Sequence, residues 1–267
     1  MSKGRAIQNL INIEQDDKVK AFICTQDLKD EEYINNHYVI MATKKGQVKK
    51  TSLEQYSRPR TNGINAITIK EDDELLEAKL TNGDSQVMIA LKSGKAIRFE
   101  EAKTRPMGRG ASGVRGVRLQ NDQDEAIGMI AVNEMDSDIL VVSENGYGKR
   151  SSLEDYRITN RGGKGVKTIS ITEKTGALVA IKNVSDNDDL MIINKSGIAI
   201  RLAVENLRVM GRATQGVKLI NLKTNDSIAA VAKVMHEEDE EITDETAVNE
   251  VLMDNTDNQT SEPKSDE

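Results

Sequence analysis

Lysine and arginine side chains recur at fixed distances from glycines along this 267-residue chain. One set stands four residues after each of four glycines, and a lysine directly precedes two of its members: Lys50, Arg98, Arg150 and Arg201, with Lys49 and Lys149. A second set precedes a later glycine by three or four residues: Arg60, Arg109, Arg161 and Arg212. A third set follows that later glycine by two residues: Arg115, Lys167 and Lys218. Guanidinium and ammonium groups bind phosphate oxygens, so a regular array of them indicates a polyanionic ligand.

The most concentrated of these basic segments is a glycine-rich loop at residues 161–165. It consists of Arg161, Gly162, Gly163, Lys164 and Gly165. Backbone without side chains can approach a phosphate closely, and the two cationic side chains can add charge-assisted hydrogen bonds. We therefore expect this loop to contact the polyanion.

Duplex DNA is the polyanion that suits a long basic array, because it presents a negative charge every ~1.7 Å along its axis. Aromatic residues make up only 3% of the chain and tryptophan is absent, which argues against a surface that stacks the bases of single strands. If equivalent positions of every repeat face one edge of the fold, the basic residues form a band around which duplex DNA can wrap.

The basic sets belong to a repeat of about fifty residues. The glycines of the first set, Gly46, Gly94, Gly146 and Gly197, are 48, 52 and 51 residues apart, and each lies between aliphatic runs. This pattern is typical of a β-hairpin with a tight turn. Each repeat continues with a strand that begins at the later glycine, an acidic or asparagine-rich turn and a fourth apolar strand. Four short strands per repeat predict an all-β, propeller-like fold.

The repeat boundaries predict one β domain over residues 1–235. It comprises a half blade at about residues 3–25 and complete blades at about residues 36–80, 84–132, 136–184 and 187–235. In the half blade Arg5 directly follows Gly4 and joins the basic sets. Residues 236–267 contain 13 Asp and Glu against one Lys; since the whole chain carries a net charge of −7, residues 1–235 carry +5. We expect the acidic segment to be a disordered tail, because it has too few apolar residues to offset the entropy of ordering.

Other kinds of site receive little support from the composition. With one cysteine, Cys24, and two distant histidines, the chain predicts no disulfide, no metal site and no cofactor of its own. No nucleophile with a base, pair of catalytic carboxylates or phosphate-binding Walker motif stands at a suitable spacing, so we predict no catalytic residue. The five tyrosines are predicted to pack within the repeats. No apolar run is long enough to span a membrane and no signal peptide is evident, which predicts a cytoplasmic protein without a membrane partner.

Four stretches of the repeats resemble the C-terminal domain of DNA gyrase A: residues 42–51, 105–119, 145–151 and 211–217. The resemblance extends over about residues 3–235. It implies a β-pinwheel, a propeller-like ring of about six blades with exchanged strands, that wraps duplex DNA on its basic rim. The family's signature box is a basic, glycine-rich segment that normally lies in the first blade. Residues 161–165, in the third complete repeat, resemble a second copy of it, and the resemblance therefore implies that the first blade is missing from this sequence.

The same resemblance implies a division of labour within the full enzyme. The catalytic tyrosine, magnesium and ATP are used elsewhere, and the expected partners are duplex DNA, the breakage-reunion part of gyrase A, and gyrase B, at the nucleoid. The resemblance also implies that the domain supports ATP-dependent negative supercoiling and is non-catalytic alone.

Two alternative functions remain open from the sequence. The corresponding domain of topoisomerase IV shares the pinwheel but lacks the box, so residues 161–165 favour gyrase. A protein-interaction propeller would be expected to carry aromatic or mixed-charge anchors on a face, in place of basic residues that recur along an edge.

Overall fold

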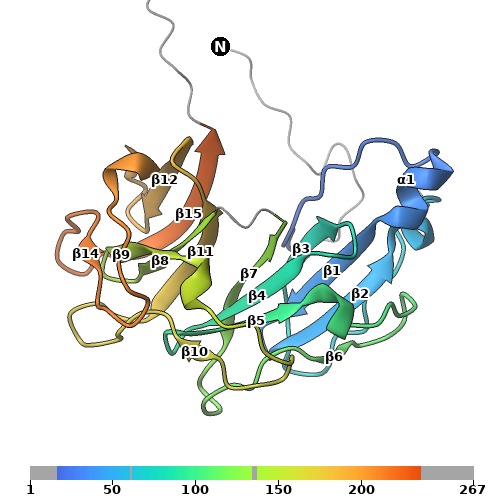
Figure 1. Cartoon of the computed structure of the whole chain (residues 1–267), viewed down its shortest axis with the longest axis horizontal. Helices are drawn as coiled ribbons and strands as arrows, with labels where there is room; N and C mark the ends of the chain where they lie inside the picture. Colours follow the sequence, from blue (N-terminus) through green and yellow to red (C-terminus); the bar gives the residue numbers. More distant parts are fainter. Residues whose placement is uncertain (1–16, 61, 134–136, 236–267) are drawn as a thin grey trace, which may run out of the picture. The chain divides into compact units, whose positions relative to one another are not determined.

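The computed structural model describes residues 17–60, 62–133 and 137–235, and this part of the chain is built mainly of β-strands (Figure 1). Each repeat begins with an antiparallel hairpin: β1 (Tyr38–Thr43) with β2 (Gln47–Ser52), β4 (Gln86–Leu91) with β5 (Lys95–Glu100), β8 (Asp138–Ser143) with β9 (Tyr147–Ser152), and β12 (Asp188–Asn194) with β13 (Ala199–Ala203). An inner strand then pairs with the first strand of its own hairpin: β3 (Leu75–Thr81), β7 (Ala126–Val132), β11 (Leu178–Val184) and β15 (Ile228–Met235). The all-β prediction is confirmed.

The hairpins form where the repeat places glycine between two β-favouring runs. Gly46 has a φ of +78°, in the left-handed region where a side chain causes strain. The turn brings Ala42 opposite Val48 and leaves Tyr38 opposite Ser52 at the open end. The hairpin glycines of the other three repeats have φ values between +79° and +87°, so one turn geometry recurs.

The outer strand of a sheet comes from the following repeat. The two-residue strand β6 (Val114–Arg115) pairs with β2, β10 (Val166–Lys167) pairs with β5, and β14 (Val217–Lys218) pairs with β9. The glycine before each short strand permits this close approach: a Cβ on Gly113, Gly165 or Gly216 would lie 2.5, 2.6 or 2.5 Å from a backbone oxygen of the preceding hairpin. The exchange of strands that the resemblance implies is thus confirmed.

The prediction of four strands in every repeat is wrong for the last repeat and for the first. The sheet of the last repeat has three described strands, in the order β13-β12-β15. Residues 62–74, where the pattern predicts a strand after Gly63, contain none. Both differences have one cause. An exchanged strand needs the hairpin of the preceding repeat, and the described residues contain no hairpin before β1 and no repeat after β15.

The predicted half blade is not formed by the residues that the structure describes. Residues 17–30 contain no strand, and the helix α1 (Glu31–Asn36) precedes β1. An inner strand at residues 19–23 would need a hairpin of its own to pair with, and none precedes α1 in the described chain. Oδ1 of Asp30 instead accepts the amides of Glu32 and Tyr33, which caps the helix. Residues 1–16, with Arg5, and the acidic segment 236–267 lie outside the described residues.

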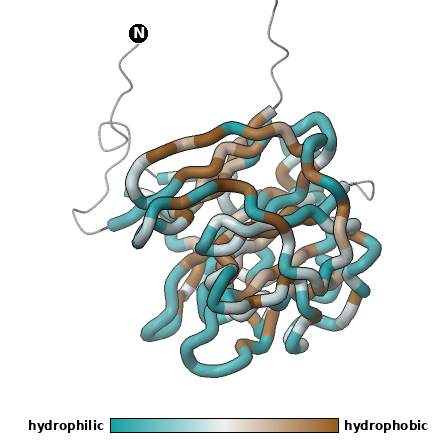
Figure 2. The backbone as a smooth tube through the Cα atoms, turned by 90° about the vertical axis from the view of Figure 1, so that its left-hand side faces the viewer, coloured by the Kyte–Doolittle hydropathy of each residue, from teal (hydrophilic) through white to brown (hydrophobic). Residues whose placement is uncertain are grey.

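The core lies between successive sheets. Ile40 and Val48 of the first sheet pack in one cluster with Ile89 and Ile97 of the second, and Val117, just beyond β6, fills the same cluster with 1% of its surface exposed. Each such side chain contributes ~1.5–3 kcal/mol on burial. In Figure 2 hydrophobic and hydrophilic stretches alternate along the backbone, and the loops at the lower edge of the view are mostly hydrophilic.

Candidate nucleic-acid interface

The basic position four residues after the hairpin glycine is buried in the first three repeats. Lys50, Arg98 and Arg150 are 4%, 7% and 9% exposed. The prediction that these three side chains lie on an exposed rim is wrong. The second hairpin strand is covered by the exchanged segment of the next repeat, so these side chains are enclosed between two repeats.

Each of these buried cations binds the short 3-10 helix of the following repeat. Nζ of Lys50 lies 2.8 Å from Oε1 of Glu101, at the start of η3 (Glu101–Lys103). Arg98 donates to the carbonyls of Leu153 and Tyr156, at 2.6 and 2.9 Å, at either end of η4 (Leu153–Asp155). Lys50 and Arg98 therefore act as tethers, by which we mean side chains that connect one repeat to the next.

Arg150 forms the third tether, and Arg201 occupies the equivalent position of the last repeat. Arg150 donates to the carbonyl of Val204, at 3.1 Å, at the start of η5 (Val204–Asn206), and pairs with Asp138 at 2.6 Å. The side chain of Arg201 is 40% exposed, and its Nε lies 2.5 Å from Oδ2 of Asp189. Arg201 is thus more accessible than the buried tethers, but it is held by a carboxylate.

The prediction that Lys49 and Lys149 lie on an exposed rim is also wrong, because these residues are 0% and 1% exposed. Nζ of Lys49 donates to the carbonyls of Ala66 and Arg109, and Nζ of Lys149 donates to the carbonyl of Gly211 at 2.6 Å. Burial lowers the pKa of both amines from 10.5 to about 8. These lysines therefore hold the loops that carry exposed arginines and cannot reach a phosphate themselves.

The lowered pKa of Lys149 predicts a pH dependence of stability. Between pH 8 and 10.5 the unfolded chain binds a proton that the folded chain has released, so the free energy of unfolding rises with pH by at most about 3 kcal/mol for this group. Below pH 8 both states are protonated and the contribution is flat. Lys149→Met should remove this part of the rise, measured as the difference between the two chains in urea unfolding at pH 7.5 and 9.5. If the free energy of unfolding rises equally with pH in the native chain and in the variant, the rise does not come from Lys149.

The basic residues on the exchanged strands face solvent, as predicted. Arg115, Lys167 and Lys218 are exposed and occupy one register position, opposite Gln47, Lys95 and Tyr147 respectively. Since β6, β10 and β14 each form the outer edge of a sheet, the structure places one cation at the equivalent point of three successive sheets.

The arginines that precede the exchanged strands connect neighbouring loops. Arg161 donates from its guanidinium to the carbonyl of Arg115 at 3.1 Å, and Arg212 donates to the equivalent carbonyl of Lys167 at 2.8 Å. Both side chains remain part-exposed. The amide of Arg118 also donates to the carbonyl of Gly163 at 2.8 Å. These bonds fix the basic loops side by side.

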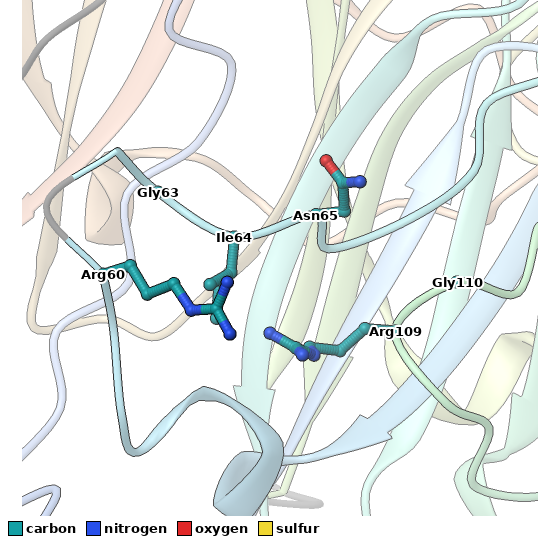
Figure 3. A pocket seen from close by; sticks show the side chains of 6 residues that line it. All are labelled: Arg60, Gly63, Ile64, Asn65, Arg109 and Gly110. Carbon is teal, nitrogen blue, oxygen red and sulfur yellow. The ribbon is translucent and has the colours of Figure 1, made fainter.

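Arg60 and Arg109 differ from this arrangement. Their side chains point toward one another across an open pocket of about 350 Å³, which Gly63, Ile64 and Asn65 also line (Figure 3). Neither guanidinium forms an ion pair within the described residues. Two converging cations, with no carboxylate among the residues that line this pocket, make it suitable for a phosphate group, although Glu54 lines the adjoining pocket beside Arg60 and Arg109.

The glycines of the 161–165 loop have architectural roles that the structure shows directly. A Cβ on Gly165 would collide with the carbonyl of Ala96, and Gly162 has a φ of +81°. The amide of Gly162 donates to the carbonyl of Gly116 at 2.6 Å, so it is already engaged by protein. Lys164 is exposed between them. The loop thus offers its side chains to solvent, while its glycines allow it to pack against the preceding repeat.

A further set of exposed arginines escaped the sequence analysis. One stands in each repeat, just after the 3-10 helix: Arg58, Arg105, Arg157 and Arg208. In the last three repeats, parallel bridges fix the residue directly after the arginine: Pro106, Ile158 and Val209 pair with Lys50, Arg98 and Arg150. The spacing could have revealed the set, because Arg105, Arg157 and Arg208 each precede an arginine of the second set by four residues.

Metal-ligand clusters, the cysteine and membrane-spanning helices can be assessed for the described part of the chain. No group of three or more metal-binding side chains occurs among the residues that the structure places. Cys24 is exposed and unpaired. No described helix is long and apolar enough to cross a membrane. Tyr156 is 1% exposed and its hydroxyl contacts that of Thr168, which agrees with a packing role.

The comparison with protein families decides what this array of repeats is. The chain matches the model described as DNA gyrase C-terminal domain, beta-propeller, over residues 37–82, 87–133, 137–185 and 188–235. The chain belongs to the DNA gyrase C-terminal domain family. It is 44% identical over 239 residues to DNA gyrase A of Staphylococcus epidermidis, and 42% identical over 260 residues to that of Staphylococcus aureus strain NCTC 8325. These alignments cover 89% and 97% of the chain but only 26% and 29% of the relatives.

Solved structures of this family share the fold. A structure of the DNA gyrase A C-terminal domain aligns with a TM-score of 0.76 at 26% identity, covering 88% of this chain and 76% of that one. The C-terminal domain of DNA topoisomerase IV aligns with a TM-score of 0.80 at 23% identity, covering 94% and 76%. The chain is therefore part of a gyrase-type C-terminal domain with the β-pinwheel fold.

Proposed function

We propose that this chain binds duplex DNA along the edge formed by its exchanged strands and wraps the duplex across successive repeats. The observation that carries the proposal is the recurrence of exposed cations on that edge. Each full exchange places an arginine after the 3-10 helix, an arginine before the short strand and a cation within it, as in Arg157, Arg161 and Lys167. Backbone and guanidinium hydrogen bonds hold adjacent loops together, which supports the proposal that their charges act as one band.

The proposed setting is a longer protein, because the chain spans little more than a quarter of the length of the curated relatives it matches. We propose that the wrapped DNA is delivered to the breakage-reunion part of gyrase A, with gyrase B as the second protein partner, in support of ATP-dependent negative supercoiling at the nucleoid. Magnesium and ATP would be used there and not by this chain. The corresponding role in topoisomerase IV is the alternative, since its C-terminal domain shares the fold. The identity to DNA gyrase A of two staphylococci favours gyrase.

The experiment that tests DNA binding is a salt series with duplexes of unrelated sequence. Binding through phosphates predicts similar affinities for all sequences and a linear fall of log affinity with log salt, of about 0.9 for each phosphate contacted. Wrapping is tested separately by adding the chain to relaxed closed circular DNA together with a type I topoisomerase. A shifted linking number after removal of protein supports wrapping. An unshifted linking number would leave binding standing and refute wrapping, whereas a flat salt response would refute phosphate binding.

The acidic segment predicts an opposing effect at low salt. Residues 236–267 carry −12 against +5 on the rest of the chain, so they are expected to compete with DNA for the basic band through screened attraction. Removing them should tighten DNA binding at 50 mM salt and have little effect at 300 mM. Equal affinities at low salt with and without the segment would show that it serves another purpose.

A further inference from the structure

The inner strands of the repeats line a pocket of their own. β3, β7, β11 and β15 contact one another in chain order, and residues of all four line an open pocket of about 450 Å³. In the four-stranded sheets the inner strand is one edge and the exchanged strand is the other, so three strand spacings of ~4.8 Å separate them. This pocket, which we call the inner pocket, therefore lies apart from the proposed DNA-binding edge.

Lysines from three repeats converge on the inner pocket: Lys79 of β3, Lys182 of β11 and Lys233 of β15. Lys79 and Lys182 occupy the same register position of the first and third repeats, and Ile130 occupies it in the second. Nζ of Lys233 lies 3.3 Å from Oδ1 of Asp188. The pocket thus places two equivalent ammonium groups on either side of an apolar residue and a third, paired one nearby.

Lys182 forms no ion pair within the described residues. The carboxylate that favours its charge is Glu77, but both oxygens of Glu77 are engaged: Oε1 lies 2.7 Å from Nζ of Lys79, and Oε2 accepts the amide of Met129 at 3.0 Å. Burial lowers the pKa of Lys182 from its usual value, Glu77 partly offsets this, and Lys79 adds to it. An ammonium in such a position is costly unless an anion joins it.

Asn183, the next residue of β11, supplies a buried acceptor beside this cation. Its Oδ1 atom is buried and accepts no hydrogen bond from the described residues, although buried acceptors are normally satisfied. The rest of the lining includes small or apolar residues, among them Ala131, Val231 and Ala232. A ligand that complements these groups carries negatively charged oxygens for the lysines and one O–H for Asn183.

We propose that the inner pocket binds inorganic phosphate. Its unprotonated oxygens accept hydrogen bonds from Lys182 and Lys79, and its hydroxyl donates to Oδ1 of Asn183. Because an ammonium group has three donors, Lys79 binds the anion and keeps its pair with Glu77. This inference goes beyond DNA binding and does not rest on it, since every residue that lines the pocket belongs to an inner strand.

Titration of inorganic phosphate into the full chain, in a buffer without other oxyanions, tests the site. The readout is the amide NMR signals of Ala131, Asn183 and Ala232, which are expected to shift saturably. Lys182→Met should weaken this binding at least about tenfold, because it removes a charge-assisted hydrogen bond. Sulfate should bind less tightly, since at neutral pH it has no hydroxyl to donate to Asn183. Signals that do not respond saturably to phosphate, or equal affinities for phosphate and sulfate, would overturn the proposal.

Thermal unfolding distinguishes a lysine that binds a ligand from one that only supports the fold. Without phosphate, Lys182→Met should melt no lower than the native chain, because methionine fills a similar space without burying a charge. Phosphate should raise the melting temperature of the native chain more than that of the variant, because a ligand stabilises the folded state that binds it. Equal rises in the two chains, or a variant that melts several degrees lower without phosphate, would show that Lys182 has a structural role and overturn the assignment.

Duplex DNA provides the second arm of the experiment, because its phosphates are the other source of this chemistry. Lys182→Met should keep the DNA affinity and salt slope of the native chain. The matched control is Lys164→Met, in the exposed 161–165 loop, which should lose about 0.9 from the salt slope and keep the phosphate-induced shifts at Ala131 and Asn183. Duplex DNA that produces the same shifts, or that displaces phosphate from the inner pocket, would show that the pocket belongs to the DNA-binding surface and overturn the proposal.

Discussion

Replacing Arg105, Arg115, Arg157 and Lys167 together by glutamine is expected to weaken the binding of duplex DNA by about 10³-fold at 0.1 M salt. All four side chains are exposed, and none forms an ion pair within the described residues. Each phosphate contact removed lowers the slope of log affinity against log salt by about 0.9, so the four together lower it by about 3.6. The loss should be similar for every duplex sequence, because phosphates carry no sequence information.

A matched variant separates this effect from a simple change in net charge. Lys18, Lys29, Lys70 and Lys195 are exposed lysines in loops and turns outside the exchanged strands, and none forms an ion pair within the described residues. Changing these four to glutamine removes the same charge and should reduce the slope far less. Equal losses in the two variants would mean that DNA follows overall charge and that the basic band is not the binding surface. Both variants should melt within a few degrees of the native chain, since exposed substitutions of this kind change stability by less than about 0.5 kcal/mol each.

The sequence was sufficient to predict the repeat, the hairpins and the all-β fold. Glycine spacing carries this information because a left-handed turn such as that at Gly46 and a close approach such as that at Gly165 leave no room for another residue. The same recurrence could not show which cations face solvent. Lys49 and Lys50 are adjacent in a strand, where alternation would turn one of them outward, yet both are buried.

The cause of that failure is the exchange of strands. A segment more than sixty residues away, at Val114 and Arg115, covers the strand that contains Lys49. Pattern reasoning within one hairpin therefore assigns an exposed face to a strand that has none. The exchanged strands themselves are only two residues long and lie at the sheet edge, so Arg115 and its counterparts were placed correctly. Arg157 and its equivalents lie in loops, where strand alternation makes no prediction, so only their four-residue spacing from the second set could have revealed them.

Arg150→Ala is expected to cause a large loss of stability, about 3 kcal/mol of unfolding free energy. Arg150 is 9% exposed and binds Asp138 and Asp186, both at 2.6 Å, as well as the carbonyl of Val204. Removing one member of a buried ion pair leaves its partner desolvated without compensation, which costs ~3–5 kcal/mol. The lower end applies here because Asp186 is 68% exposed and can recover solvent. For a domain of this size such a loss corresponds to a fall in melting temperature of roughly 6–12 °C.

The control is Arg157→Ala, seven residues away in the same repeat, which removes an equal charge from an exposed position and should leave the melting temperature nearly unchanged. The two variants should show opposite behaviour in DNA binding. Below its melting temperature Arg150→Ala should keep most of its affinity, because its guanidinium is enclosed between repeats, while Arg157→Ala should lose about one phosphate contact from the salt slope. If Arg150→Ala were stable but weak in DNA binding, the guanidinium would be reaching the duplex, and its assignment as a tether between repeats would be wrong.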